Sequence, residues 1–444
     1  MIYWAPLLHF YQPPTQIHWV LKKVCDESYR PLVKVFREAS YAKVTVNINA
    51  VLTEMLAEYC MSDVIDGLRE LAEEGRIEFT GSAKYHPILP LIPQGEVVRQ
   101  IIQNYHTNKF FFGNSYSPQG FFPPEMSYSP DIVKPILDTG HRWIILSGIA
   151  CPTAWPTQVI HQISSSDGKM LAVFFRDDIL SNRISFQHID AREFINQLRG
   201  LQRKKENVYA ITAMDAETFG HHIKHWEELF LEEVYEKIEP ENNHSRPTRV
   251  GELYRQLVQC ADLADEHCKL LCSEELAETN EIRVVTISEL LKLLPSGDTV
   301  KPHPSSWSTS WDDIKAGNPY PLWKSKDNLL HQLQWQHLKI AMDMTNKAQQ
   351  VATTEAAMSY ADIARGLLDR ALHSDQFWWA SRKPMWDINL VHKGILQQRE
   401  VILNAYKAIN MSDLTEDEKT EHYYRVIAGR DLRSKITDQL LMYP

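Results

Sequence analysis

The stretch VYAITAMDAE, residues 208–217, places two carboxylates at the end of a mostly apolar run. The run up to Met214 has the length and composition of a buried strand. Asp215 and Glu217 alternate beyond it, so in an extended conformation their side chains would point the same way. In parallel barrel folds the active site lies at this end of the strands. The stretch therefore predicts a buried β-strand with acidic groups at a functional edge.

Around this stretch, up to about residue 295, short apolar runs alternate with amphipathic segments, as in a parallel α/β fold. The expected strands are Ile2–Leu8, Lys43–Asn47, Arg76–Thr80, Gly120–Phe122, Trp143–Leu146, Leu171–Phe175, Val208–Met214 and Val284–Thr286. The expected helices are Asn49–Tyr59, Ser62–Glu74, Gly95–Phe112, Ser129–Thr139 and Ala191–Leu201. Seven or eight strands of this kind favour a distorted (β/α) barrel over residues 1–295. A doubly wound sheet is the weaker alternative, because no glycine fingerprint follows the first strand.

Residues 296–444 have a different pattern. A proline-rich connector reaches about residue 327, and long helical segments with few breakers follow it. These segments are Asn328–Gln350, Glu355–His373, Asn389–Ile409 and about Glu418–Leu441. They predict a C-terminal helical domain attached to the barrel.

The overall composition excludes some classes of function. A net charge of −10 argues against nucleic acid as a partner. No apolar window approaches the about 18 residues of a membrane span, and no secretory leader is evident. Six scattered cysteines without a CxxC pair fit a reducing compartment, and Cys268 and Cys272, one turn apart, are a weak metal candidate. We therefore expect a soluble, cytoplasmic protein without a cofactor or metal, whose oligomeric state the sequence leaves open.

Polar residues at other expected strand ends complete a candidate site. Glu125 follows two aromatic residues and two prolines, which stiffen the loop and remove two backbone donors. It could be catalytic or could cap the helix that begins near Ser129. Asp215 and Glu217 could instead form a salt bridge or bind a metal. His9 lies at the expected end of the first strand, and His86 precedes Pro87 in a loop. Either residue could be functional or buried in the core.

Two carboxylates from different strand ends are what a glycosidase requires. One must be ionised so that it can attack the anomeric carbon or support a cationic transition state. The other must hold a proton for the leaving oxygen. Their separation decides between retention and inversion, and a sequence gives no distance. A metal-dependent polysaccharide deacetylase, with Asp215, His221 and His225 as ligands, is an alternative enzyme class. A glycan-binding protein without catalysis is a non-enzymatic alternative.

Five motifs in order resemble glycoside hydrolase family 57. They are HFYQP at 9–13, HPILP at 86–90, FPPE at 122–125, DAETFG at 215–220 and SDQFW at 374–378. The resemblance implies an incomplete (β/α)7 TIM-like barrel, followed by a C-terminal α-helical domain that completes the substrate cleft. It also implies retention of configuration, metal-free chemistry and an α-glucan or maltooligosaccharide substrate. The expected activity is α-amylase-like, with a 4-α-glucanotransferase or a branching enzyme as alternatives.

The resemblance also assigns roles to residues. Glu125 would be the nucleophile and Asp215 the general acid/base. Asp375 and Trp378 would reach the sugar site from the helical region. Tyr11 stands where the family usually has a histidine, and a phenol carries no titratable charge near neutral pH.

The remaining candidates follow from their positions near these motifs. His9, Tyr11, His86 and Glu217 are expected to bind substrate, with Glu217 alternatively orienting Asp215. The segment WSTSW at 307–311 could be a sugar platform or the packing joint between domains.

Overall fold

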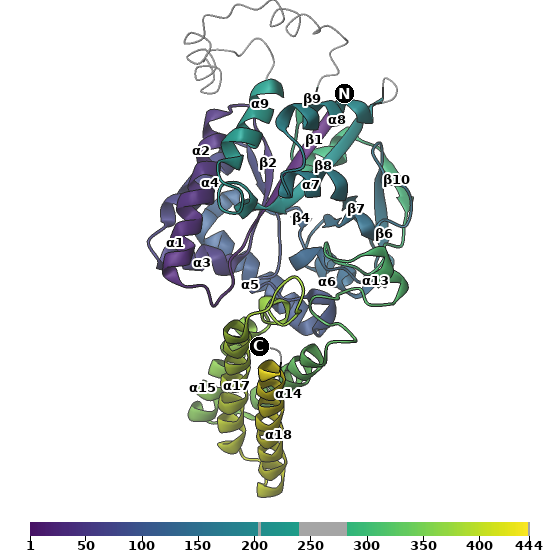
Figure 1. Ribbon diagram of the computed structural model, residues 1–444. Coiled ribbons are helices and arrows are strands. Elements are labelled where there is room, and N and C mark those ends of the chain that lie inside the picture. Colours follow the sequence, from purple (N-terminus) through teal and green to yellow (C-terminus); the bar gives the residue numbers. More distant parts are fainter. Residues whose placement is uncertain (203–205, 239–281, 443–444) are drawn as a thin grey trace, which may run out of the picture.

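The computed structural model describes residues 1–202, 206–238 and 282–442, which form an α/β part and a helical part (Figure 1). The weak metal candidate at Cys268 and Cys272 lies outside the described residues. The strands are β1 (Ile2–Phe10), β2 (Val44–Ile48), β3 (Ile77–Phe79), β4 (Gly120–Phe121), β5 (Trp143–Leu146), β6 (Ile160–Ser164), β7 (Met170–Phe175), β8 (Val208–Asp215), β9 (Ile282–Val284) and β10 (Ser296–Thr299).

The helices of the α/β part and the connector are α1 (His18–Val24), α2 (Arg30–Glu38), α3 (Ala50–Glu58), α4 (Ser62–Glu73), α5 (Gln94–Phe112), α6 (Val133–Asp138), α7 (Asp178–Ser185), α8 (Ala191–Leu201), α9 (Glu233–Ile238), α12 (Ile287–Leu293) and α13 (Trp311–Lys315). Those of the helical part are α14 (Leu329–Val351), α15 (Glu355–Ala371), α16 (Asp375–Trp378), α17 (Ile388–Asn410) and α18 (Glu416–Leu441).

The strands form two five-stranded sheets. In the first the order is β3-β2-β1-β8, and β9 pairs with the first residues of β1; all these pairs are parallel. In the second the order is β10-β6-β7-β5-β4, where only β6 and β7 pair in the antiparallel direction. The α/β part is therefore a mixed fold, and the carboxyl ends of β1, β2 and β8 lie at one edge.

The two sheets meet where β3 approaches β4 and where β7 approaches β8. The Gly81 amide donates to the carbonyl of Gly120 at 2.8 Å, and the Phe122 amide donates to the carbonyl of Gly81 at 2.9 Å. A Cβ on Gly81 would lie 2.0 Å from a ring nitrogen of His141, so only glycine permits this approach. On the other side the Asp177 amide donates to the carbonyl of Ile211 at 2.8 Å.

Alternate residues of the strands separate into two apolar cores. The side chains of Ile2, Trp4 and Leu8 pack outward against the helices. The intervening residues Tyr3, Ala5 and Leu7 pack inward with residues of β5, β7 and β8. This alternation follows from the period of two in a strand. The inner layer lies between the two sheets and carries the site at its edge.

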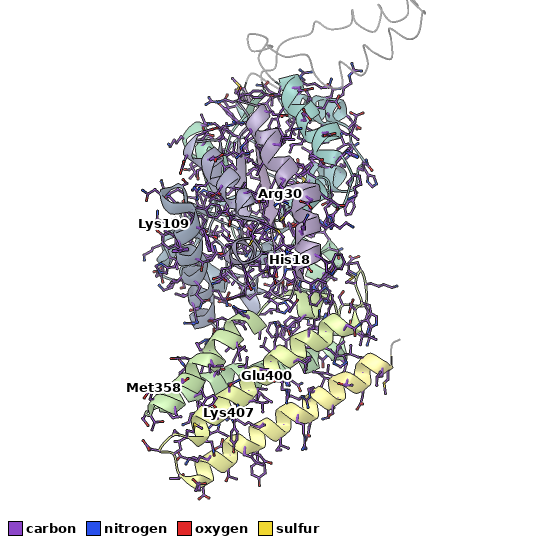
Figure 2. The ribbon with its side chains drawn as sticks, turned by 90° about the vertical axis from the view of Figure 1, so that its left-hand side faces the viewer. His18, Arg30, Lys109, Met358, Glu400 and Lys407 are labelled. Atoms are coloured by element: carbon purple, nitrogen blue, oxygen red, sulfur yellow. The ribbon has the colours of Figure 1, made fainter. Side chains whose placement is uncertain are left out.

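The helical part is fixed to the α/β part by ion pairs and a shared core. Arg365 of α15 donates to both oxygens of Glu96 on α5 at 2.8 Å, and Arg99 of α5 donates to both oxygens of Asp369. One apolar cluster contains residues from both parts, such as Ile132 and Leu338. Figure 2 shows α17 and α18 lying alongside each other, with Glu400 and Lys407 on α17.

All eight expected strands are present, and their ends differ from the expected bounds by at most two residues. The four long C-terminal helices are also found within a few residues of their expected bounds. β6 and β10 were missed, because IHQIS and SGDT lack the apolar runs on which the prediction relied. No helix in the described ranges combines the length and apolarity that crossing a bilayer requires.

Candidate active site

Glu125 lies in a stiff loop directly after β4. Its φ is 57°, in the left-handed region, and the next residue, Met126, has φ 47°. A non-glycine residue in this region costs about 1–3 kcal/mol and persists only where its surroundings hold it. Trp307 holds Glu125 in two ways: its indole Nε1 donates to Glu125 Oε2 at 2.8 Å, and its amide donates to the Glu125 carbonyl at 3.1 Å.

Asp215 is the last residue of β8 and pairs in register with His9 of β1. The chain leaves the extended conformation here, since Ala216–Thr218 form a single helical turn. The expectation that Asp215 and Glu217 alternate on one strand is therefore wrong. Glu217 instead accepts hydrogen bonds from the phenol of Tyr29 and from Gln12 Nε2, the latter at 3.0 Å.

Arg176, at the end of β7, lies behind Asp215. Its Nε donates to the carbonyl of Ala213 at 2.7 Å, and one of its terminal nitrogens pairs with Asp178 at 2.7 Å. The guanidinium is almost fully buried, and its positive charge lowers the pKa of Asp215 against the opposing effect of burial.

A stack of aromatic rings forms one wall of the site. The rings of Tyr11 and His86 stack with centroids 3.9 Å apart, and His9 stacks between His86 and Phe122. His9 Nδ1 lies 2.6 Å from Asn47 Oδ1, and its Nε2 lies 3.2 Å from His86 Nε2. Burial lowers the pKa of His9 to about 4 and that of His86 well below its usual value, so both rings are neutral at pH 7.

The helical part contributes Asp375 and its neighbours. Asp375 accepts a hydrogen bond from the phenol of Tyr11 and lies 3.1 Å from His373 Nδ1. The preceding residue, Ser374, places its hydroxyl 3.0 Å from His86 Nδ1. The phenol of Tyr11 thus bonds directly to the carboxylate that the helical part supplies.

Asp375 also borders a pocket of about 300 Å³ between the loop after β1 and the start of α17. Trp378 and Trp379 line it from one side, and Pro13, Thr15 and Gln16 from the other. Trp378 is half-buried and Trp379 is buried, so the exposed part of the Trp378 ring is available to this pocket. An indole face beside hydrogen-bonding side chains suits a sugar ring.

Three carboxyl groups of the site, those of Glu125, Asp215 and Glu217, have raised pKa values. Burial raises the pKa of Glu125 to about 8, and the charges of Asp375 and Asp215 act in the same direction. The hydrogen bonds from Trp307 and Ser374 oppose this shift because they stabilise the charged form. Burial also raises the pKa values of Asp215 and Glu217. Glu125 and Asp215 therefore interact electrostatically across the edge of the two sheets.

The histidines of the alternative metal site point elsewhere. His221 Nδ1 lies 2.6 Å from Glu27 Oε2, and His225, with 72% of its side chain exposed, lies 3.8 Å from Glu228. Within residues 1–202, 206–238 and 282–442, no three His, Cys, Asp or Glu side chains converge in an arrangement that could hold a metal ion. The geometry therefore offers no deacetylase-like centre around Asp215.

The structure brings the predicted residues His9, Tyr11, His86, Glu125, Asp215 and Asp375 to one edge of the fold, with Trp378 beside them and Glu217 just behind. Sequence reasoning missed Ser374, Gln12 and Tyr29 as partners, although Ser374 and Gln12 lie inside the quoted motifs. It left Trp307 undecided between a platform and a joint. The structure places Trp307 against Glu125, which its isolated position in the connector could not reveal.

Comparisons with known proteins show what this chain is similar to. A model of the family described as Glycosyl hydrolase family 57 matches residues 8–262. An α-amylase from Pyrococcus horikoshii is 28% identical over 244 residues, covering 52% of this chain and 37% of the relative. A 4-α-glucanotransferase from Thermococcus kodakarensis is 26% identical over 221 residues, 48% of this chain and 32% of the relative. The chain thus spans about a third of the length of these curated relatives.

Among solved structures, the GH57-type branching enzyme from Pyrococcus horikoshii superimposes with a TM-score of 0.66 at 14% identity. The match covers 96% of this chain and 94% of that one. Both the mixed sheets and the helical C-terminal part therefore share the fold of that structure over nearly all of its length.

Proposed function

The chain belongs to glycosyl hydrolase family 57, and from this membership we propose that it is a retaining glycoside hydrolase or transglycosidase acting on α-glucans. The observation that carries the proposal is the meeting of Glu125 and Asp215, which come from the ends of β4 and β8 and interact electrostatically. Glu125 accepts a hydrogen bond from the indole N–H of Trp307, and Asp215 interacts electrostatically with the buried Arg176. Such a pair can divide nucleophilic and acid/base roles.

The proposed first step starts from the form in which Glu125 is ionised and Asp215 is protonated, although burial raises the pKa of Glu125 to about 8 in the free protein. The Glu125 carboxylate then attacks the anomeric carbon and forms a glycosyl ester. Asp215 donates its proton to the glycosidic oxygen that leaves. In the second step Asp215 removes a proton from water or from a sugar hydroxyl, which then attacks the ester. Trp307 favours the ionised form of Glu125 by donating to it, and positive charge developing at the anomeric carbon would favour it further.

The substrate contacts that we propose are those of the ring stack and the helical part. His9 and His86, both neutral, are also proposed to bind substrate, where a sugar hydroxyl beside Glu125 would replace one of the contacts that their ring nitrogens make with each other, Asn47 and Ser374. Tyr11 and Asp375 act as a bonded pair, and Trp378 provides a stacking face. Glu217 accepts hydrogen bonds from Tyr29 and Gln12, and it is proposed to bind substrate or, alternatively, to orient Asp215.

We also propose that the α/β part, residues 1–295, is an incomplete (β/α)7 barrel and that the helical domain, residues 296–444, completes the substrate cleft. Support comes from seven strands in the order β1, β2, β3, β4, β5, β7, β8 and from the joints at Gly81 and Asp177. A cytoplasmic location is proposed because the described cysteines Cys25, Cys60 and Cys151 are unpaired thiols.

Two substitutions test the roles. Glu125→Gln should abolish turnover of maltoheptaose, because an amide cannot form the glycosyl ester, whereas Glu58→Gln on the exposed end of α3 should leave it unchanged. Asp215→Asn should impair maltoheptaose cleavage far more than release of fluoride from α-maltosyl fluoride, since fluoride leaves without a proton. Full activity of Glu125→Gln would contradict the assignment.

Hydrolysis and transfer share these steps and differ in what attacks the ester. Incubation with maltoheptaose alone separates them. Products longer than maltoheptaose indicate a glucanotransferase, new α-1,6 linkages indicate a branching enzyme, and shorter chains with matching reducing ends indicate an amylase.

A further inference from the structure

The helical part contains a second pocket, formed by the middle of α14, α17 and α18. Its volume is about 200 Å³, and its floor is apolar, built by Ile402, Leu403, Val426 and Gly429. Its remaining lining consists of basic side chains: His337, Arg399, Arg430 and Arg433. The candidate active site shares none of these residues.

Positive charge is concentrated in this pocket although the chain as a whole carries −10. Arg399 pairs at 2.7 Å with the neighbouring Glu400, and Arg430 pairs at 2.9 Å with the neighbouring Asp431. Both of these pairs are exposed, where ion pairs contribute little and leave the guanidinium free to bind elsewhere. Arg433 is half-buried, and among the described residues no carboxylate pairs with it.

A buried chain of hydrogen bonds fixes the tautomer of His337. Gln376 Nε2 faces the carbonyls of Ala371 and His373, which only accept, so its Oε1 accepts from Gln398 Nε2 at 2.6 Å. The Oε1 of Gln398 therefore faces His337 Nδ1 at 2.7 Å, and that nitrogen must carry the proton. The donor-to-acceptor direction of all these hydrogen bonds therefore follows from the two backbone carbonyls at the end of the series.

The other ring nitrogen of His337 is consequently a bare acceptor. It lies 3.8 Å from the position that a Cβ on Gly429 would occupy, on the side of the pocket floor. Burial lowers the pKa of His337, and the charge of Arg433 lowers it further, so the ring is neutral at pH 7. The pocket thus presents three guanidinium groups together with one acceptor.

We propose that this pocket binds a phosphomonoester whose organic group is apolar. The phosphate oxygens satisfy the guanidinium groups, whose planar forks match phosphate geometry. The monoanion of a phosphomonoester also carries one P–O–H group, which can donate to His337 Nε2. Sulfate has the same shape but no proton at neutral pH, and it leaves this acceptor unmatched. The apolar floor accommodates the organic group.

Titration calorimetry of the full chain at pH 6 tests this site without any measurement of glucan turnover. Phenyl phosphate should bind with a Kd of about 1 mM or tighter, inorganic phosphate about tenfold more weakly, and sulfate more weakly still. Arg433→Gln should weaken phenyl phosphate binding at least tenfold. The matched control Arg370→Gln, on the exposed surface of α15, should bind like the wild type.

A second variant keeps every charge. Gly429→Ala places a methyl group 3.1 Å from Ile402 Cδ1 and reduces the space at the apolar floor of the pocket. Alanine also has a higher helix propensity than glycine. It should weaken phenyl phosphate more than inorganic phosphate, with no loss of thermal stability. Absence of saturable binding by either phosphate, or equal binding of phosphate and sulfate in the wild type and Arg433→Gln, would overturn the proposal.

Discussion

Replacing Glu125 with glutamine should stabilise the folded protein at pH 8 while it abolishes turnover. Burial raises the pKa of this carboxyl from 4.5 to about 8, and the charges of Asp375 and Asp215 contribute in the same direction. Glutamine has nearly the same shape and can still accept the hydrogen bond from Trp307 Nε1. It carries no charge at any pH, so the cost of ionising the buried group disappears.

The sign and size follow from linkage. An acid whose pKa is higher in the folded state than in the unfolded state destabilises the fold as the pH rises between the two values. For Glu125 this interval runs from 4.5 to about 8, which corresponds to roughly 5 kcal/mol at about 1.36 kcal/mol per pH unit. Because 18% of the side chain remains exposed, water screens part of this, and we expect about 2–3 kcal/mol.

The assay compares thermal unfolding of the wild type, Glu125→Gln and the exposed control Glu58→Gln at pH 5 and pH 8. With an unfolding entropy of about 2 cal/mol/K per residue, the variant should unfold roughly 2–3 °C higher at pH 8. Most of this difference should vanish at pH 5, where the carboxyl is protonated in the fold. A lower midpoint at pH 8, or an equal rise at both pH values, would refute the electrostatic reasoning.

Three further perturbations address the rest of the site and the joint to the helical part. Trp307→Phe removes the donor to Glu125, so the acidic limb of the kcat/KM profile should move about one unit to higher pH; an unmoved limb would show that this bond does not set the ionisation. Tyr11→Phe keeps the ring stack but loses the bond to Asp375, so kcat/KM on maltoheptaose should fall about 10- to 100-fold, with Tyr11→His retaining more activity than Tyr11→Phe. Asp369→Ala removes a buried carboxylate that accepts hydrogen bonds from Arg99, Gln103 and Arg365 at the joint, so urea denaturation should report a loss of about 1.5–3 kcal/mol; a change below about 0.5 kcal/mol would mean that this carboxylate does not hold the two parts together.

The strands could be predicted because the signal for a buried strand is local. Runs such as Trp143–Leu146 and Val208–Met214 are apolar throughout, and they are found as β5 and β8. β6 could not be found in this way: its residues alternate between buried and exposed, and it pairs in the antiparallel direction with β7. The pairing with β7 stabilises β6, and the sequence pattern of β6 alone does not predict this pairing.

The same limit applies to the site. The position of Glu125 after β4 is visible in the sequence, but its left-handed backbone is held by Trp307, which is 182 residues away. The extended alternation expected for Glu217 fails because Tyr29 and Gln12 draw this side chain away from the line of β8. Such contacts join remote segments, and no local periodicity reports them.

The protonation states of the site explain how four acidic side chains can lie close together there. Glu125, Asp215, Glu217 and Asp375 meet at one edge, while the two histidines between them, His9 and His86, are kept neutral by burial.

The buried cation that acts on Asp215 is Arg176. The edge therefore has an excess of negative potential, which part of the group relieves by retaining protons. A positive centre that forms in the cleft during reaction would meet this potential already in place. Because the protein groups need not rearrange, such a site stabilises a cationic, oxocarbenium-like transition state more than a neutral sugar, and that difference is what accelerates cleavage.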